Sequence, residues 1–362
     1  MNEVGKGLAD IETPFLWVDL DTMDENVRVV TGFLRDAGVA WRPHIKGIRA
    51  PGAALRLLDA GAIGVTCATV GEAEIMAEAG IHDLLVANQV VGERKYARVA
   101  ELRRRADVKV AVDGDETLAG LGRAAVAAGV EIGVVVELDV GMHRAGVPPG
   151  QPAVALARRV QGTRGLRLAG VMGWEGHTAW MDDPDTKRHE IERSIRALVE
   201  TAELFRKAGC PVDIVSCGGS CTYTVSAAIP GVTEVQAGGG VFSDVTYRRH
   251  GAGTRPALFV RATVTSRPAP DRIIVDAGFK TLPAWINAPE ALGVPGVREI
   301  GISAEHGTVR LTAPDHRVRV GDVLDFVPAY GDITVFLHDR LHAVRGGRVE
   351  HEWPIEGRGK VR

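Results

Sequence analysis

The sequence predicts an α/β protein with a closed (β/α)8 TIM-type barrel, followed by a second, mostly antiparallel β domain. From residue 15 to about residue 240, short apolar runs alternate with runs rich in Ala, Glu and Arg. This alternation is typical of βαβ units in a parallel sheet. About eight such units in roughly 220 residues match the size of a barrel, and an open doubly wound sheet is the main alternative. Beyond residue 253 the helical runs stop, and short strands separated by turn residues follow.

Taken in order, the chain divides into three parts. We expect residues 1–20, with an apolar run after Thr13-Pro14, to form a strand segment that joins the β domain. Residues 21–253 are expected to form the barrel, and residues 254–362 the C-terminal β domain. The barrel strands are expected near 39–43, 64–68, 83–87, 109–112, 133–138, 168–172, 213–216 and 234–237.

The helices between these strands are expected from runs in which apolar residues recur at helical spacing. Five of them are expected at 23–37, 71–79, 93–105, 116–128 and 187–208. In the β domain, Pro-rich turns separate short apolar runs, which is typical of antiparallel strands. These strands are expected at 258–266, 272–276, 307–311, 323–327 and 334–337.

Composition restricts the class of function. Hydrophobic residues make up 45% and charged residues 25% of the 362 residues, the balance of a globular protein with a sizeable core. The formal net charge of −3 provides no broad basic face for nucleic acid or an anionic membrane. The start of the chain lacks an apolar signal segment, and no apolar run is long enough to cross a bilayer. We therefore expect a cytoplasmic protein that binds no nucleic acid and no membrane.

The four cysteines, Cys67, Cys210, Cys217 and Cys221, are too few for a disulfide framework in a chain of this size. No His or Cys pair with zinc-ligand spacing lies beside them. We interpret them as small buried residues rather than metal ligands.

Lys46 ends the stretch Arg42-Pro43-His44-Ile45-Lys46, just past the first expected barrel strand. Side chains alternate along a strand, so His44 is expected on the same side as Lys46. A lysine near other cations, or partly desolvated, is neutral often enough to form an imine with a carbonyl group. Arg42 and His44 are suitable neighbours. The alternative is that Lys46 is an ordinary solvated charge.

Polar residues and glycines follow the other expected strands, and the active site of a barrel lies at these strand ends. Two glycine-rich stretches, at 216–220 and 236–240, follow the last two strands. Each alone is most simply a tight turn, but two at neighbouring strand ends indicate a phosphate site, to which Ser220 could donate its hydroxyl. The other strand-end residues are Thr69, Asn88, Gln89, Asp113, Asp139, Arg144, Trp174, Glu175 and His177.

Arg144 follows the most apolar strand of the chain. Its guanidinium could bind a phenolate or carboxylate in the site, or form an ion pair with Asp139 that holds the loop. A lysine, two phosphate-binding turns and an arginine together suggest pyridoxal phosphate (PLP), which carries an aldehyde, a phosphate and a ring oxygen. The loop after the sixth strand contains Glu175, Trp180, Asp182 and Asp183, which could contact the substrate. We favour the alternative that they are solvated surface residues.

Several ordered stretches connect the chain to a known family: 42–46, 136–144, 231–238, 275–278 with Lys280, 303–307 and 337–339. Over nearly its whole length the chain resembles the alanine-racemase-like fold type III PLP enzymes, in the branch of D-threonine aldolase and D-serine dehydratase. Ordered matches of this kind are more specific than any single motif.

The resemblance implies that Lys46 is the Schiff-base lysine and that Arg144 binds the ring oxygen of PLP. Gln236 stands where the racemases carry an arginine against the ring nitrogen, so a neutral partner would leave that nitrogen unprotonated. Trp174 is expected beside the ring, with His177 after it as a proton-transfer group. The full set of expected cofactor contacts is His44, Lys46, Gln89, Arg144, Trp174, Ser220, Gln236, Gly238 and Gly239.

Two stretches depart from the family pattern. The relatives bind a metal through a histidine and, two residues later, an aspartate or cysteine, but here Tyr330 stands in place of the histidine, with Asp332 after it. A phenol with a pKa near 10 is a poor ligand. Either Asp332, with waters and His306, binds magnesium or manganese, or the metal is lost and Tyr330 acts as an acid or base. Residues 47–49, Gly-Ile-Arg, replace the usual Thr-His-Lys, so substrate preference could differ.

The resemblance implies a homodimeric lyase that cleaves a D-β-hydroxy-α-amino acid, a small-molecule substrate, into glycine and an aldehyde. Lys46, His177 and Tyr330 are its candidate catalytic residues. One alternative is a metal-free dehydratase, deaminase or racemase, in which Lys46 and Tyr330 or His177 move the α-proton. Another is a non-catalytic PLP carrier, which the second domain disfavours because such carriers lack one.

Overall fold

The computed structural model describes residues 2–362 and forms two compact units. We call them the barrel unit (residues 30–46, 54–238 and 360–362) and the β unit (residues up to 29, 47–53 and 239–359). The chain passes from one unit to the other after residues 29, 46, 53, 238 and 359. The domain limits expected from the sequence stay a prediction.

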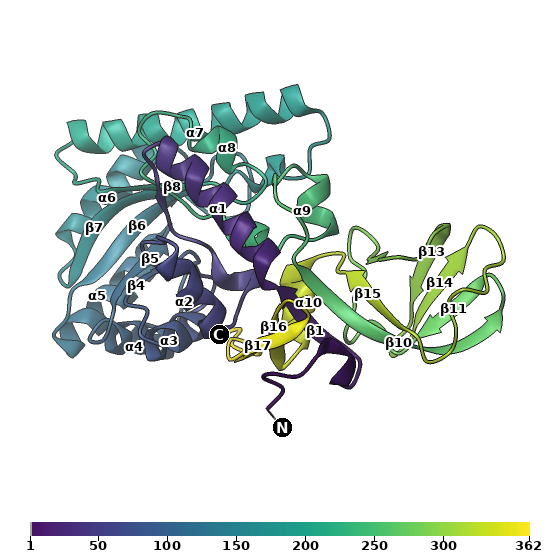
Figure 1. The fold of residues 1–362 in the computed structure, drawn as a ribbon. Coiled ribbons are helices and arrows are strands. Elements are labelled where there is room, and N and C mark those ends of the chain that lie inside the picture. The colour runs from purple at the N-terminus through teal and green to yellow at the C-terminus, as the bar shows by residue number, and fades with distance from the viewer. Residues whose placement is uncertain (1) are drawn as a thin grey trace. The chain divides into compact units, whose positions relative to one another are not determined.

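The barrel unit contains one parallel eight-stranded sheet in the order β2-β9-β8-β7-β6-β5-β4-β3. Figure 1 labels β4 to β8 of this sheet. The two ends of this sheet meet, because His44 forms a parallel bridge with Thr66 and the Ile63 amide donates to the Trp41 carbonyl at 2.9 Å. This confirms the predicted barrel over an open sheet. The strands are β2 Ala40–Trp41, β3 Val65–Cys67, β4 Asp83–Val86, β5 Asp107–Val112, β6 Ile132–Leu138, β7 Leu166–Gly173, β8 Ile214–Cys217 and β9 Glu234–Val235.

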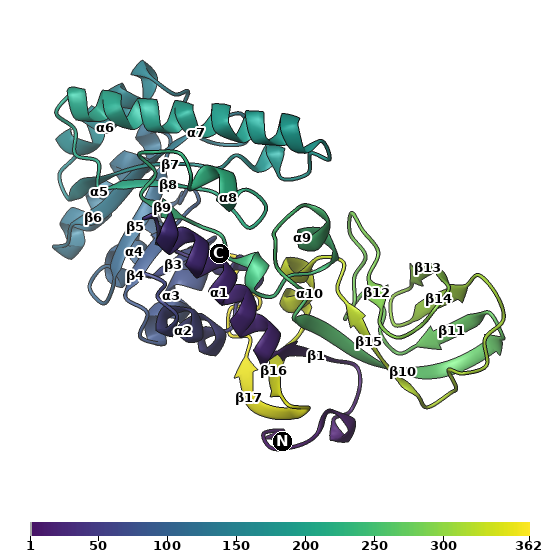
Figure 2. The same ribbon diagram turned by 45° about the horizontal axis from the view of Figure 1, so that its top comes forward.

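Helices alternate with these strands, and α3 to α7 lie around the outside of the sheet (Figure 2). Local signals set their ends. Thr69 caps α3 by accepting from the Glu72 amide, and Gly129, at φ 67°, ends α5. The five predicted helices are present, with ends shifted by a few residues. The helices are α1 Leu20–Asp36, α2 Pro51–Asp59, α3 Val70–Glu78, α4 Glu93–Leu102, α5 Asp115–Ala128, α6 Gln151–Gly162, α7 Pro184–Lys207 and α8 Tyr223–Ser226.

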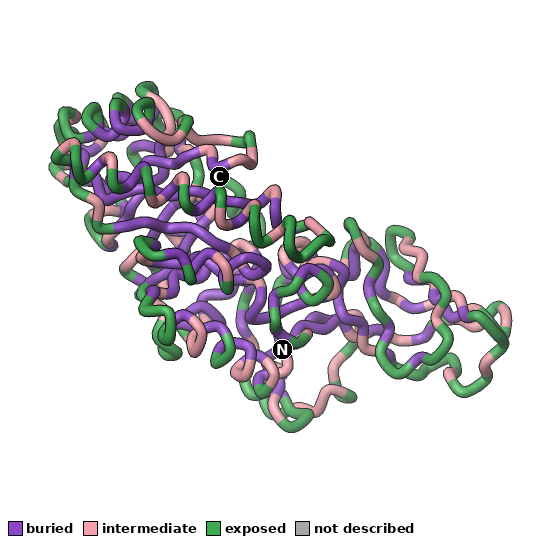
Figure 3. Tube along the Cα trace, turned by 90° about the horizontal axis from the view of Figure 1, so that it is seen from above, coloured by how far each residue is buried: buried purple, intermediate pink, exposed green. Residues whose placement is uncertain are grey.

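Most residues of the barrel strands are buried, on both faces of the sheet, and Figure 3 draws buried segments in purple. Every residue of β6, Ile132–Leu138, is buried. Helices cover the outer face of the sheet, and side chains fill the inside. One buried cluster joins consecutive strands through Leu85, Ala111, Val135, Ala169, Met172 and Ile214.

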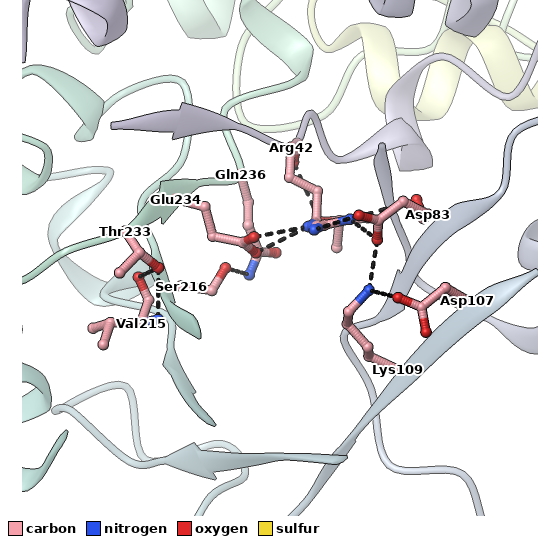
Figure 4. Close-up of polar contacts among 10 residues, drawn as sticks. Arg42, Asp83, Asp107, Lys109, Val215, Ser216, Thr233, Glu234 and Gln236 are labelled. Atoms are coloured by element: carbon pink, nitrogen blue, oxygen red, sulfur yellow. Dashed lines mark hydrogen bonds and ion pairs between the residues drawn. The ribbon is translucent and has the colours of Figure 1, made fainter. Parts of the chain in front are cut away.

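Arg42 is 2% exposed and holds a buried ion-pair network (Figure 4). Its Nε lies 3.0 Å from both carboxylate oxygens of Glu234, and Nη1 lies 2.6 Å from Oδ1 of Asp83. Lys109 extends the network to Asp83 and Asp107, at 2.7 Å each. The three carboxylates lie at the starts of strands β9, β4 and β5, whereas Lys46 lies beyond the end of β2. The Arg42 guanidinium is neutralised there, so it is not the cationic neighbour of Lys46 that we expected.

Replacing Arg42 by methionine should destabilise the protein by about 3–5 kcal/mol, because Glu234, 3% exposed, would remain charged and buried without its partner. Urea denaturation of both proteins measures this difference. The control is Arg123→Met, which breaks an exposed ion pair with Glu93 and should cost less than about 1 kcal/mol. Equal losses in the two variants would contradict the prediction.

The β unit is built on a nine-stranded sheet that contains the path β13-β14-β11-β10-β1-β16-β17, with β15 paired to β10 and β12. The N-terminal strand β1 lies antiparallel to β10 and parallel to β16. The other pairings are antiparallel, which confirms the mostly antiparallel prediction. The strands are β1 Phe15–Asp19, β10 Leu258–Ala269, β11 Arg272–Val275, β12 Glu290–Ala291, β13 Val297–Ile302, β14 Gly307–Leu311, β15 Val323–Val327, β16 Arg340–Arg345 and β17 Arg348–Pro354.

One expected strand, at 334–337, is wrong. These residues belong to helix α10, Gly331–Leu337, and a second short helix, α9, spans Val245–Arg249. A four-residue apolar run does not distinguish a strand from a helix. Here the Thr334 amide and hydroxyl both donate to the Tyr330 carbonyl, at 3.2 and 3.0 Å, and so form the first helical turn. No helix of the described residues has the length and apolarity to span a bilayer.

Candidate active site

Lys46 lies in a short 3-10 helix, Ile45–Gly47, immediately after β2. The His44 amide donates to the Gln236 carbonyl at 3.0 Å, and the Lys46 amide donates to His44 Nδ1 at 3.4 Å. A Cβ added to Gly238 would lie 2.0 Å from the His44 carbonyl oxygen. The lysine loop and the glycine turn after β9 therefore lie side by side, and only glycine allows this close approach.

The glycine turn after β8 is held by Glu175. This carboxylate is fully buried and accepts from the hydroxyls of Thr222 and Ser226, at 2.6 and 2.7 Å, and from the Gly218 amide at 3.3 Å. Our expectation that Glu175 is solvated is wrong, because the turn after β8 folds over it. The glycine turns after β8 and β9 follow neighbouring paired strands, and glycine turns of this kind are suited to binding a phosphate.

Trp174 packs against this turn. A Cβ added to Gly219 would lie 2.4 Å from the indole ring. Ser220, the next residue and the expected phosphate ligand, is buried. Gln236, on the neighbouring turn, is buried and donates through Nε2 to Ser216 Oγ at 2.9 Å (Figure 4). The pair is uncharged, in keeping with the expected neutral partner for a ring nitrogen.

Arg144 lies at the end of β6 and is paired with Glu137, not with Asp139. The Arg144 guanidinium lies 3.7 Å from the buried Glu137 carboxylate, which also accepts from the Gln89 amide group. Burial raises the pKa of Glu137. Asp139 instead binds the amides of Gly141 and His143, at 3.0 and 2.9 Å. Arg144 keeps 54% of its side chain exposed and lines a small hollow with Glu137, Met142 and Trp174.

His177 has both ring nitrogens buried without a hydrogen-bond partner among the described residues. Its ring packs against the turn after β6, because a Cβ added to Gly141 would lie 2.9 Å from Cε1. Buried polar atoms are nearly always satisfied. The unsatisfied imidazole beside the turn after β6 therefore indicates that a bound group supplies its partner.

These residues fit PLP. Lys46 carries an amine that can react with an aldehyde, the glycine turns are suited to a phosphate, and Arg144 carries a cation suited to a ring oxygen. The assignment of these roles stays a prediction. The unsatisfied His177 is an independent sign of a bound group.

Comparison with known families agrees with this geometry. A family model described as the alanine racemase N-terminal domain matches residues 18–245, which is more than half of the chain. The chain belongs to this family. A second model, described as a putative serine dehydratase domain, matches residues 257–344 of this alanine-racemase-family chain.

Individual relatives are similar over their full length. D-threonine aldolase of Arthrobacter sp. is 37% identical over 98% of this chain and 95% of its own, and 3-hydroxy-D-aspartate aldolase of Paracoccus denitrificans (strain Pd 1222) is 33% identical over 98% and 94%. The crystal structure of D-threonine aldolase from Filomicrobium marinum superposes with a TM-score of 0.96 at 35% identity, covering 99% of both chains. These matches confirm the predicted PLP-dependent family and its fold.

D-threo-3-hydroxyaspartate dehydratase from Delftia sp. HT23 also superposes, with a TM-score of 0.86 at 29% identity, covering 96% of this chain and 98% of its own. The family fold therefore accompanies both aldolases and dehydratases. The roles of single site residues in this chain stay predictions.

Tyr330 and Asp332, at the positions where the family pattern places metal ligands, lie in the β unit. The residues at this position do not fit a metal. Asp332 Oδ2 accepts from the Tyr330 hydroxyl at 2.9 Å, and Oδ1 accepts from the Tyr247 hydroxyl at 3.0 Å. Burial, and next the Asp332 charge, raise the pKa of Tyr330, so its phenol is a neutral donor. The described residues contain no group of three or more His, Cys, Asp or Glu placed to hold a metal, and His306 is exposed.

Tyr247 is a residue that sequence reasoning missed. It lies in α9, whose N-cap residue Asp244 accepts from the Tyr247 amide at 2.7 Å and from the Gly331 amide at 2.6 Å. Burial raises the pKa of Asp244 to about 7. The Asp-x-x-Tyr spacing at a helix start was the only signal available, and it indicates a cap rather than a site.

Proposed function

We propose that this protein is a PLP-dependent lyase that cleaves a D-β-hydroxy-α-amino acid into glycine and an aldehyde. The observation that carries the proposal is the full-length similarity to D-threonine aldolase, 37% identical over 98% of the chain. The strand-end lysine, the phosphate cradle and Arg144 support it, because a lyase of this kind needs each of them.

PLP, when bound, supplies an aldehyde that captures the substrate amine and a ring that accepts the electrons of the broken bond. Lys46 Nζ would hold its aldehyde carbon, and Ser220, Gly238 and Gly239 would bind its phosphate. Arg144 and Gln236 would bind the ring oxygen and the ring nitrogen. His44, Gln89 and Trp174 would orient the ring.

In the cleavage itself, the substrate's β-hydroxyl O–H bond breaks and its proton passes to a base of the protein. The O–H electron pair forms the aldehyde C=O as the Cα–Cβ bond breaks. Cα keeps the electron pair of that bond and takes a proton, which gives glycine. We propose that His177, whose ring nitrogens have no hydrogen-bond partner among the described residues, returns this proton, and general acid–base groups of this kind contribute about 10²–10⁴-fold in rate.

Dehydration is the second candidate. The putative serine dehydratase match at residues 257–344, and 34% identity over 76% of this chain to D-threo-3-hydroxyaspartate dehydratase of Delftia sp. (strain HT23), favour it. That reaction would give a 2-oxo acid and ammonia. The β unit continues to disfavour the carrier alternative, because single-barrel carriers have no such unit.

The test is to incubate the PLP-loaded protein with D-threonine and with D-3-hydroxyaspartate, and to measure aldehyde, glycine, 2-oxo acid and ammonia. We expect aldehyde and glycine in equal amounts, and no reaction with L-threonine as the control. Equal amounts of 2-oxo acid and ammonia would establish the dehydratase instead. Binding of PLP without any product would establish the carrier.

We also propose that the enzyme is a cytoplasmic homodimer. The resemblance supports the dimer, and the four cysteines, all free and buried, are in keeping with a reducing compartment. Light scattering of the purified protein measures the number of subunits.

A further inference from the structure

Two neutral phenols of the β unit contact the Asp332 carboxylate. Tyr330 and Tyr247 donate to its two oxygens, at 2.9 and 3.0 Å. The two phenol rings are themselves packed together, with centroids 5.7 Å apart, and Trp285 packs on Tyr330 at 5.1 Å. Each carboxylate oxygen therefore already accepts a hydrogen bond from a neutral phenol.

Gly47 closes one side of the same carboxylate. A Cβ added to Gly47 would lie 2.3 Å from Asp332 Oδ1 and 2.9 Å from Cγ, closer than real Cβ contacts. A threonine at position 47 is therefore incompatible with this carboxylate position. The two departures from the family pattern, Gly47 and Tyr330, are thus in contact with one group, although 283 residues separate them (330 − 47).

Asp244 fixes the two segments that carry the phenols. It is fully buried and binds the backbone amides of Tyr247 and Gly331. The Thr246 hydroxyl adds a bond to the Ala329 carbonyl. Asp332, Tyr330 and Tyr247 therefore lie on segments that buried hydrogen bonds hold together. This is the arrangement of a preorganised site. Gly47, against Asp332, is bonded directly to Lys46.

We propose that Asp332, Tyr330 and Tyr247 form a metal-free acid–base group, in which the two phenols take the place of a divalent cation at the carboxylate. The first part of this proposal, that the carboxylate binds no metal, does not depend on the proposed lyase function. The role of Asp332 as the acceptor of the β-hydroxyl proton rests on the proposed lyase function. In that role the proton moves to an Asp332 oxygen, and Tyr330, Tyr247 and Gly47 are positioning residues.

Metal binding tests the first part without any activity. The PLP-loaded wild type and Tyr330→His are incubated with Mn²⁺ or Zn²⁺, dialysed, and analysed for metal by mass spectrometry. We expect the wild type to retain far less than one ion per chain. Tyr330→His, which restores an imidazole two residues before a carboxylate, should bind at least about tenfold more tightly. About one tightly held ion per wild-type chain would overturn the proposal.

A chelator tests the same point in the working enzyme. Cleavage of D-threonine by the wild type should be unchanged by excess EDTA, and chelator-sensitive cleavage would overturn the proposal. If the wild type cleaves no substrate, the lyase function fails, while the metal analysis still decides whether the carboxylate is metal-free.

Gly47→Ala tests the positioning. Its Cβ must displace the Asp332 carboxylate, so we expect kcat to fall by roughly 10²-fold, with KM for D-threonine nearly unchanged and the long-wavelength absorbance of bound PLP retained. The matched control is Gly301→Ala, since an added Cβ there meets nothing within 4 Å. Unchanged kcat in Gly47→Ala would overturn the positioning role, and a loss confined to thermal stability would do so as well.

Discussion

Lys46→Ala should lose the long-wavelength absorbance of bound PLP and at least about 10⁴-fold of the cleavage rate. Alanine has no amine to hold the aldehyde, and no other lysine takes that place in the loop after β2. The absorbance spectrum of the purified variant, followed by the D-threonine assay, measures both effects.

The matched control for this variant is Lys207→Ala, which removes an exposed lysine in the last turn of α7. It should leave both the spectrum and the rate unchanged. A Lys46→Ala protein with the wild-type spectrum would show that another residue holds PLP, and the site proposed at these strand ends would then be wrong.

Asp332→Asn has the second largest expected effect. The amide keeps the shape of the carboxylate but loses its charge and its ability to accept a proton, so we expect kcat to fall by about 10²–10⁴-fold. The absorbance of bound PLP should stay, because Asp332 is not among the expected cofactor contacts. Steady-state kinetics with D-threonine, together with the spectrum, separate a lost base from a lost cofactor.

Asp322→Asn is the control for this variant, since Asp322 is an exposed residue in the turn before β15. It should retain the wild-type rate. Full activity in Asp332→Asn would exclude Asp332 as the base and would direct attention to His177, whose ring nitrogens lack partners among the described residues.

Several features of the site were predictable because they depend on short stretches of sequence. Lys46 follows a strand, and two glycine turns follow β8 and β9, so parallel strands place all three at one end of the barrel. Arg144 was predicted in the same way. Its partner was not, because Asp139 is closer in sequence while Glu137 is the carboxylate that the structure places beside it.

Other features depended on contacts between distant segments. From the sequence alone, Glu175 was expected to be a surface charge. In the structure the turn after β8 covers it and supplies Thr222 and Ser226 as hydrogen-bond donors. The run at 334–337 is equally apolar in a strand or a helix, and only the hydrogen bonds to Tyr330 decide for α10.

The sequence by itself determined the barrel, the mostly antiparallel β domain and the residue types of the PLP site. Hydrophobic periodicity and turn residues are local properties, and they dictate which elements form. Only the tertiary structure decided the partners of the charged groups, because an ion pair or hydrogen bond joins whichever side chains the fold brings together. Asp332 meets Tyr247, 85 residues away, and Gly47 at the other end of the chain. The motif that contains Tyr330 and Asp332 left both a bound metal and its loss open, and the proposed metal-free chemistry rests on the contacts that the fold adds.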